Sequence, residues 1–240
     1  MNDILDDDFE PEPPSAERVA ARALVLSAVS CRALIEKDAH KPGAEGLRKE
    51  ILPWLEAIGA MGEAEPAEIA LISIPLGELD PKRGLDASWR SEGMAALAWV
   101  LGFSELPQVH VQCEPSDTAK SLGFLEDIED TAMHRPRLRD PNEIERRTDT
   151  YLTLHWRLRQ LSFDPMPKDF VAYASACKWA AMRLDELEII ENDLAIDGVL
   201  IHKVKNKKYH EVCSITQERH QALNWLMGFE KLYSQVTTDT

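Results

Sequence analysis

The chain has 240 residues, of which 44% are hydrophobic and 29% are charged, as in an ordinary globular protein. Its formal net charge of −15 repels the phosphates of DNA and RNA, so the composition argues against nucleic-acid binding. A basic protein partner or a small cation would instead be attracted to such a surface.

Two features of the chain favour a cytoplasmic location. No run approaches the ~18 apolar residues of a membrane-spanning helix, and the acidic start argues against a secretory signal, which needs a basic region before an apolar one. The cysteines are far apart and show no C-x-x-C spacing: Cys31, Cys113, Cys177 and Cys213. We therefore expect reduced thiols rather than disulfides or metal ligands, and no association with a membrane.

The chain divides into an acidic arm and a folded body. Residues 1–14, MNDILDDDFEPEPP, hold six acids, no bases and three prolines. Such a segment buries too little apolar area to offset the entropy lost on ordering, so we predict a disordered acidic N-terminal arm over residues 1–14. Residues 15–240 are of a suitable length for a single, mainly helical domain.

Most of the body has the periodicity of helices. Ser15 is a good N-cap for a helix that runs to about Lys37, and Asp140-Pro141 marks the start of another that runs to about Leu161. Further helices are expected over residues 47–58, where Pro53 would kink the chain, after Pro66, over 116–126 and over 168–190.

Three short segments have the pattern of extended chain. Residues 108–113, QVHVQC, alternate between polar and apolar positions. Asp197-Gly198 separates two apolar runs, which predicts a β-hairpin near residues 193–203, and residues 204–212 would add an extended segment. The predicted fold class is therefore mainly α: a single-domain helical bundle with a small β-hairpin.

A repeated segment is the most informative feature of the chain. Residues 88–103, SWRSEGMAALAWVLGF, align without gaps with residues 214–229, SITQERHQALNWLMGF. We call these the echo segments. They predict two helices with Ser88 and Ser214 as N-caps and a glycine in the left-handed conformation just past each end. Two helices in similar structural roles, a chance likeness and a tandem duplication would each produce this pattern.

Each echo segment places a glutamate on the same helical face as a tryptophan, Glu92 with Trp99 and Glu218 with Trp225. An unpaired charge buried beside an indole would cost several kcal/mol. We therefore expect both glutamates to be partly buried and to contact arginine side chains. Both tryptophans are expected in the core.

Several motifs follow one another in an order that is more specific than any of them alone: Glu17–Leu24, Ser88-Trp89-Arg90, Leu138-Arg139, His155-Trp156, Glu218–Trp225 and Thr237–Thr240. Through them the chain resembles a bacterial domain-of-unknown-function family, catalogued as 4272, over residues 16–240. It departs from the usual pattern between Phe163 and Val212, where it has an extended insertion. The resemblance implies no known reaction, fold name or catalytic residue.

The polar residues of these motifs make up the candidate polar site: Arg90, Glu92, Glu143, Asp149, His155, Glu218, Arg219 and Asn224. Carboxylates beside indoles can have raised pKa values and act as acids or bases. Alternatively, arginines pair with these carboxylates in a structural network covered by indoles. Convergence on one open pocket would favour an enzyme, whereas burial and mutual pairing would favour a structural role.

Metal and cofactor motifs are missing from the sequence. The seven histidines include no H-x-x-x-H and no H-E-x-x-H, and the common nucleotide and α/β-hydrolase signatures do not occur. We therefore predict no metal site and no cofactor. Residues 202–210, HKVKNKKYH, are expected to form a solvated strand face, or else a patch for an anion or a partner.

The function that these observations favour is a non-catalytic binding or protein-interaction module. The alternative is an enzyme of unknown type, with a carboxylate/His pocket formed by the Trp-Arg-Glu motifs.

Overall fold

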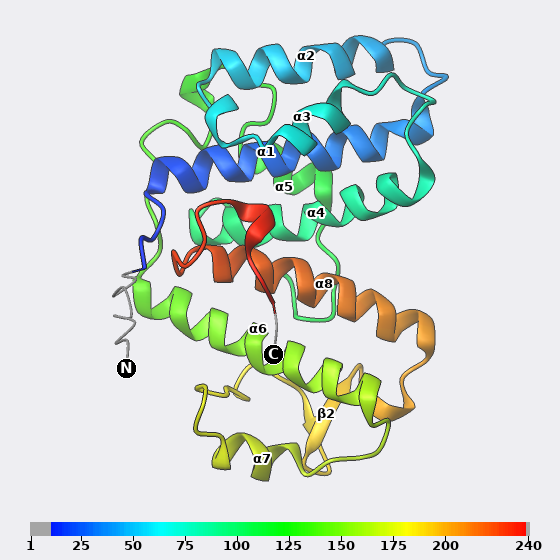
Figure 1. The fold of residues 1–240 in the computed structure, drawn as a ribbon, viewed down its shortest axis with the longest axis vertical. Coiled ribbons are helices and arrows are strands. Elements are labelled where there is room, and N and C mark those ends of the chain that lie inside the picture. The colour runs from blue at the N-terminus through cyan, green and yellow to red at the C-terminus, as the bar shows by residue number, and fades with distance from the viewer. Residues whose placement is uncertain (1–10, 239–240) are drawn as a thin grey trace, which may run out of the picture.

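The computed structural model describes residues 11–238, whose body is a stack of long helices (Figure 1). From top to bottom in that view lie α2 (Ala44–Ala57), α1 (Ala16–Leu34), α4 (Pro81–Val100), α8 (Asn206–Trp225) and α6 (Pro141–Phe163). Helices α3 (Pro66–Ser73) and α5 (Pro115–Ser121) pack against α1, and α7 (Phe170–Ala176) lies with a small sheet beyond α6. The predicted fold class is confirmed.

The helix starts follow from capping residues. Ser15 Oγ accepts a hydrogen bond from the Arg18 N–H at 3.4 Å, and Asp140 Oδ1 accepts one from the Asn142 N–H at 2.9 Å, as the sequence predicted. Every residue of α1 from Val19 to Ser30 is buried, so this helix is covered on all sides. Such a helix forms the centre of a core rather than one face of it.

The two echo helices begin earlier than predicted. Asp80 caps α4 by accepting a hydrogen bond from the Arg83 N–H at 2.9 Å, and α8 begins at Asn206, so Ser88 and Ser214 lie inside helices and are not N-caps. The extended segment expected over residues 204–212 is also wrong, because α8 takes in most of it. The helix ends are as predicted, since Gly102 and Gly228 both have a φ of +78°.

Two further predictions are wrong. Residues 108–113 form a loop instead of a strand, because side chains from other elements bind its backbone, as described below. The helix expected over residues 168–190 stops at Ala176, and the chain then runs irregularly to β1 (Ile189–Ile190). Local propensity is a weak guide where tertiary contacts decide the backbone.

The predicted hairpin is present and belongs to a three-stranded antiparallel sheet. Strands β2 (Asp193–Ile196) and β3 (Val199–Leu200) pair with Ile196 opposite Val199, and β1 pairs with the other edge of β2. Asp197 and Gly198 have φ values of 51° and 74°, which a two-residue turn of this kind requires.

Part of the predicted arm contacts the folded body. Residues 1–10 of the predicted disordered arm lie outside the described residues, but Pro14 is buried and the Glu12 N–H donates to the Gly228 carbonyl at 3.0 Å. A Cβ at position 228 would stand 2.3 Å from the Glu12 carbonyl carbon, so only glycine permits this approach. Within residues 11–238 no helix is both long and apolar enough to cross a membrane.

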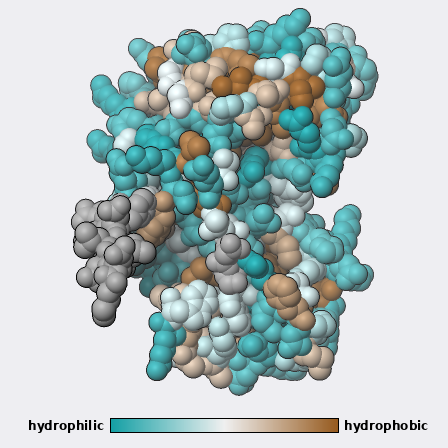
Figure 2. All heavy atoms as spheres, in the orientation of Figure 1, coloured by the Kyte–Doolittle hydropathy of each residue, from teal (hydrophilic) through white to brown (hydrophobic). Residues whose placement is uncertain are grey.

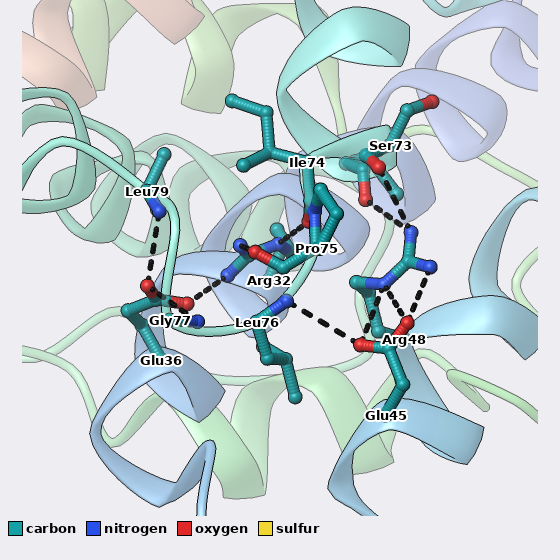
Figure 3. A network of polar contacts seen from close by, with 11 residues as sticks. Arg32, Glu36, Glu45, Arg48, Ser73, Ile74, Pro75, Leu76, Gly77 and Leu79 are labelled. Carbon is teal, nitrogen blue, oxygen red and sulfur yellow. Dashed lines mark hydrogen bonds and ion pairs between the residues drawn. The ribbon is translucent and has the colours of Figure 1, made fainter.

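Two arginine–glutamate pairs hold the connection between α3 and α4 (Figure 3). Glu36 accepts hydrogen bonds from the Gly77 and Leu79 N–H groups, both at 3.0 Å, and pairs with Arg32. Arg32 in turn donates to the carbonyls of Ile74 and Pro75. On the other side of the segment, Glu45 and Arg48 of α2 pair with each other and bind the backbone of residues 72–76. An irregular segment thus obtains from side chains the hydrogen bonds that a helix would supply itself.

We expect this network to weaken in acid. Hydrogen bonds from Arg48 lower the pKa of Glu45 to about 2 from an ordinary 4.5. Burial alone would raise the pKa of Glu36, but hydrogen bonds from Arg32, Gly77 and Leu79 outweigh it, so that pKa is lowered too. A carboxylate with a lowered folded-state pKa stabilises the fold fully above its ordinary pKa and loses this effect as the pH falls toward the lowered value.

The test is a series of urea melts between about pH 5 and pH 2. The free energy of unfolding should fall with pH more steeply in the wild type than in E45Q. E50Q, which changes an exposed glutamate of the same helix, should retain the wild-type slope. Equal slopes in E45Q and the wild type would contradict the assigned role of Glu45.

Both echo tryptophans lie in the core, as predicted, with Trp99 4% and Trp225 1% exposed. Replacing Trp225 by Ala should therefore lower the free energy of unfolding by about 3–5 kcal/mol in denaturant melts. W179A is the matched control, since Trp179 is 56% exposed, and it should lower the free energy of unfolding by only about 0.5 kcal/mol. A loss below about 1 kcal/mol in W225A would show that the indole does not fill the core.

Candidate functional site

The two echo helices, α4 and α8, lie side by side and run in the same direction (Figure 1). Two ion pairs join them. Glu92 of α4 pairs with Arg219 of α8, with Oε2 and Nη2 2.6 Å apart. Glu218 of α8 pairs with Arg90 of α4, with Oε2 and Nη1 3.0 Å apart. Both echo glutamates therefore meet arginines, as predicted, and each partner comes from the opposite helix.

The first pair is completely enclosed, with both side chains 0% exposed. Beyond Glu92, the Arg219 guanidinium donates to the Tyr151 hydroxyl at 2.8 Å and to three backbone carbonyls, those of Pro107, Gln108 and Val111. The other Glu92 oxygen accepts the Cys113 N–H at 2.9 Å. This explains the irregular path of residues 107–113, whose polar backbone groups bind a buried ion pair in place of a neighbouring strand.

Nothing in this enclosed cluster is available to a reactant. Burial raises the pKa of the Cys113 thiol to about 12 and also raises that of the Tyr151 hydroxyl, so neither group ionises near neutral pH. A buried charge pair whose lone pairs and donors are satisfied is a structural element.

The second pair borders a cleft. Glu218 is mostly buried, whereas the Arg90 side chain is 31% exposed and also donates to the Gln221 side chain at 3.0 Å. The cleft beside them has a volume of about 360 Å³ and is lined by Asp86, Trp89, Arg90, Ser214, Gln217 and Glu218. Burial raises the pKa of Glu218 in spite of the opposing effect of Arg90.

The remaining members of the candidate polar site lie elsewhere. Asp149 pairs with Arg183 at 3.2 Å, and Asn224 donates to the Thr237 carbonyl at 3.1 Å. His155 faces His220, with their Nδ1 atoms 2.9 Å apart, and burial lowers the pKa of His220 to about 3. Glu143 lies half-buried in the first turn of α6. The eight residues thus do not converge on one pocket.

The structure also contains buried arginine–carboxylate pairs that the sequence did not suggest. Arg157 forms two hydrogen bonds with Asp193, both at 2.7 Å, and these side chains are 0% and 2% exposed. Arg22 pairs with Glu68 across α1 and α3. No local signal marks these residues, because their partners are far away in the chain. Groups of three or more His, Cys, Asp or Glu side chains that could hold a metal ion do not occur within the described ranges.

A different hollow has the character of a binding site. An apolar cavity of about 360 Å³ lies between α1, α2 and α5, lined by Ser27, Ser30, Cys31, Leu34, Ile35, Leu47, Pro115, Ser116, Ala119, Lys120, Phe124 and Leu125. Concave, mainly apolar hollows with a few polar groups are the usual form of ligand and anchor sites. Burial raises the pKa of the Cys31 thiol to about 11, so this cysteine lines the cavity as an apolar group.

Residues 126–130, which we call the acidic loop, follow the last residues that line this cavity. After Phe124 and Leu125 come four exposed carboxylates around Ile128, which is 49% exposed: Glu126, Asp127, Glu129 and Asp130. The Trp54 indole Nε1 donates to the Glu126 carbonyl at 2.8 Å and so ties this acidic loop to α2.

A glycine lets the acidic loop fold back. Gly123 has a φ of +72°, and a Cβ there would lie 2.1 Å from the Asp130 carbonyl oxygen. The sequence contained the signal for this surface, a run of acids around one isoleucine after a glycine, but nothing in it placed a cavity beside the run.

A scan against family models matches residues 3–183 to the family described as Domain of unknown function (DUF4272). The chain belongs to the DUF4272 family. The matched range contains α4, the apolar cavity and the acidic loop, but it stops before α8 and so before the second echo segment. No curated protein and no solved structure shows significant similarity to the chain.

The two echo glutamates of this DUF4272 protein should respond oppositely to neutralisation. Glu92→Gln keeps the shape but leaves Arg219 buried without its counter-charge, so the free energy of unfolding should fall by about 1–3 kcal/mol at pH 7. Glu218 has a raised pKa, so its ionised form destabilises the fold as the pH rises through that pKa, and the effect disappears below its ordinary pKa. Glu218→Gln should therefore leave stability at pH 7 unchanged or raised.

Paired urea melts at pH 7 and about pH 4.5 would measure both effects. A loss in E218Q as large as that in E92Q would show that the Arg90–Glu218 pair, too, is primarily structural.

Proposed function

We propose that this DUF4272 protein is a non-catalytic protein-interaction module of the bacterial cytoplasm. In this proposal the apolar cavity between α1, α2 and α5 receives a hydrophobic anchor of a basic protein partner. The observation that carries the proposal is the position of the acidic loop, since four exposed carboxylates and Ile128 directly follow the cavity residues Phe124 and Leu125.

The absence of a catalytic role is inferred from what the motif residues do. Arg219 and Glu92 are enclosed and fully hydrogen-bonded, and Asp149 and Asn224 bind other parts of the chain. An acid–base site needs groups that can reach a substrate. Most of the charged motif residues instead hold helices together.

The chemistry of the partner follows from the charge and the shape. A net charge of −15 attracts a basic protein, and exposed carboxylates at the rim of a hydrophobic site steer and orient it. The lining itself holds one cation, Lys120, against four carboxylates on the loop. A large apolar side chain entering a hollow with a charged rim is the usual arrangement of an interaction hot spot.

Hydrophobic side chains are also exposed at the end of the molecule that contains α2. In Figure 2 they gather in the upper part of the visible face, over α2 and α3, whereas hydrophilic residues cover much of the rest. Helix α2 also forms one wall of the cavity, although no residue of α3 lines it.

The cytoplasmic location is proposed on two grounds. All four cysteines are free, which fits a reducing compartment, and the described helices include none that could cross a membrane. The negative charge further argues against nucleic acid as a partner.

The interaction is tested with a photo-crosslinking residue in place of Ile128, in the whole chain and in its native host. Captured proteins are identified, purified and titrated against two variants. A119W fills the cavity, and the quadruple variant E126Q/D127N/E129Q/D130N removes the loop charge. We expect a basic protein whose affinity falls at least about tenfold with either variant.

The matched control is E145Q/D164N/D185N/E230Q, which removes the same number of charges from exposed positions outside the acidic loop. Its affinity for the partner should stay within about twofold of wild type. Equal weakening by the control and the loop variant, or a partner that binds A119W as well as wild type, would overturn the proposal. So would capture of a second copy of this chain or of an acidic protein.

An enzyme remains the alternative because of one observation. Glu218 combines a raised pKa with a position beside the cleft that Trp89 and Asp86 line, and such perturbed groups cluster at catalytic sites. Histidine does not complete this cleft, since His155 and His220 face each other elsewhere.

A further inference from the structure

A second and larger cleft lies beside Trp89. Its volume is about 690 Å³, and it is formed by the end of α1, the first half of α4, the loop before α5 and the first half of α8. The lining consists of Leu34, Lys37, Leu85, Ser88, Trp89, Ser91, Gln112, Pro115, Lys207, His210, Glu211 and Ser214. Trp89 and Ser214 line both this cleft and the smaller one beside Glu218.

Several side chains at this cleft have free hydrogen-bond donors. The enclosed arginines Arg219 and Arg157, by contrast, are bound to carboxylates and carbonyls. Within the described residues, five side chains at this cleft make no hydrogen bond or ion pair: Lys37, Trp89, Gln112, Lys207 and Ser214. Each of them can donate a hydrogen bond, through an ammonium, an indole N–H, an amide or a hydroxyl.

The lining also carries positive charge. It comes from the ammonium groups of Lys37 and Lys207, whereas the carboxylate of Glu211 is bound by Lys208 Nζ at 2.8 Å. Lys207 lies in the first turn of α8, whose N-terminal end adds a partial positive charge. In a protein with a net charge of −15, a hollow with two unpaired ammonium groups is a local reversal of sign.

The shape of the ligand follows from the apolar part of the lining. The Trp89 indole is half-buried, and Leu34, Leu85 and Pro115 add apolar surface around it. A planar ring stacks well on an indole face, and its burial adds apolar contact that an inorganic ion cannot make. A free ammonium group binds the oxygens of phosphate or carboxylate equally as a point charge.

We propose that this cleft binds a small organic anion, in which a phosphate or carboxylate group is joined to a flat unsaturated ring. Lys37 and Lys207 bind the anionic group, Ser214 and Gln112 donate to its oxygens or to polar ring substituents, and the ring lies against Trp89. This assignment gives a role to the basic run at residues 202–210. The run contributes Lys207 and His210 to the cleft, so its anion-binding interpretation is favoured over a solvated strand face.

Four probes separate the features of the ligand in calorimetric titrations with the whole chain. AMP and indole-3-acetate each carry a flat ring with a phosphate or a carboxylate, adenosine has the ring alone, and inorganic phosphate has the charge alone. We expect at least one ring-bearing anion to bind at least about tenfold more tightly than adenosine and inorganic phosphate. Comparison of AMP with indole-3-acetate tells which anionic group is preferred.

Charge-reversing variants locate the site. K37E/K207E should weaken binding of the preferred probe at least about tenfold, and W89L should weaken the ring-bearing probes but not inorganic phosphate. The matched control K178E/K203E changes two exposed lysines outside the lining, one of them in the same basic run, and should bind within about twofold of wild type.

Failure of both ring-bearing anions to bind would overturn the proposal. Unchanged binding in K37E/K207E, an equal loss in the control, or phosphate binding as tight as that of the preferred ring-bearing anion would overturn it as well. Circular dichroism checks that the variants fold. If K37E/K207E does not, K37Q/K207Q removes the charges without reversing them, and the same comparison decides the outcome.

Discussion

The enclosed contact between Glu92 and Arg219 is the interaction on which the rest of this structure depends. Removing two ions from water costs several kcal/mol each, and their mutual attraction offsets this only when other groups satisfy the remaining donors and lone pairs. Here the partners are Tyr151 of α6, the Cys113 N–H and three carbonyls of the loop before α5. One ion pair therefore fixes the relative positions of α4, α8 and α6 and the path of residues 107–113.

The same principle is repeated at other places in the molecule. Arg22, Arg32, Arg157 and Arg219 are among its largest fully buried side chains. Each donates several hydrogen bonds to carboxylates or carbonyls of segments that are distant in sequence. The buried acids Glu92, Asp193 and Glu218 nearly balance these four cations, so the net charge of −15 lies almost wholly at the surface. Two local features differ from the rest of that surface: the unpaired lysines in the cleft and the cluster of acids around the exposed Ile128.

The sequence predicted features that depend on nearby residues. The caps at Ser15 and Asp140, the Asp197-Gly198 turn and the glycines that end the echo helices were all found where local chemistry placed them. The requirement that Glu92 and Glu218 meet arginines also followed from simple energetics.

The predictions failed where residues distant in sequence determine the backbone conformation. Residues 108–113 have the alternating polar and apolar pattern of a strand, but Arg219 binds carbonyls of this segment and it forms a loop. Helix α4 begins after Asp80, which caps it, and not at Ser88. For the candidate site, the expected contact with arginines is confirmed for Glu92 and Glu218, but the sequence did not say which arginine each would meet. Asp149, His155 and Asn224, which were expected in the same site, lie elsewhere. Helical spacing shows which residues share one face of a helix. It does not show which other helix packs against that face.

The crossed pairing of α4 and α8 bears on how the family itself is delimited. The matched range ends at residue 183, yet the counter-charge of Glu92 is supplied by residue 219. The boundary of sequence similarity therefore cuts through a buried ion pair and is not a boundary of autonomous folding. A fragment that ends at residue 183 would expose the side of α4 that packs on α8 and leave the Glu92 carboxylate without its arginine.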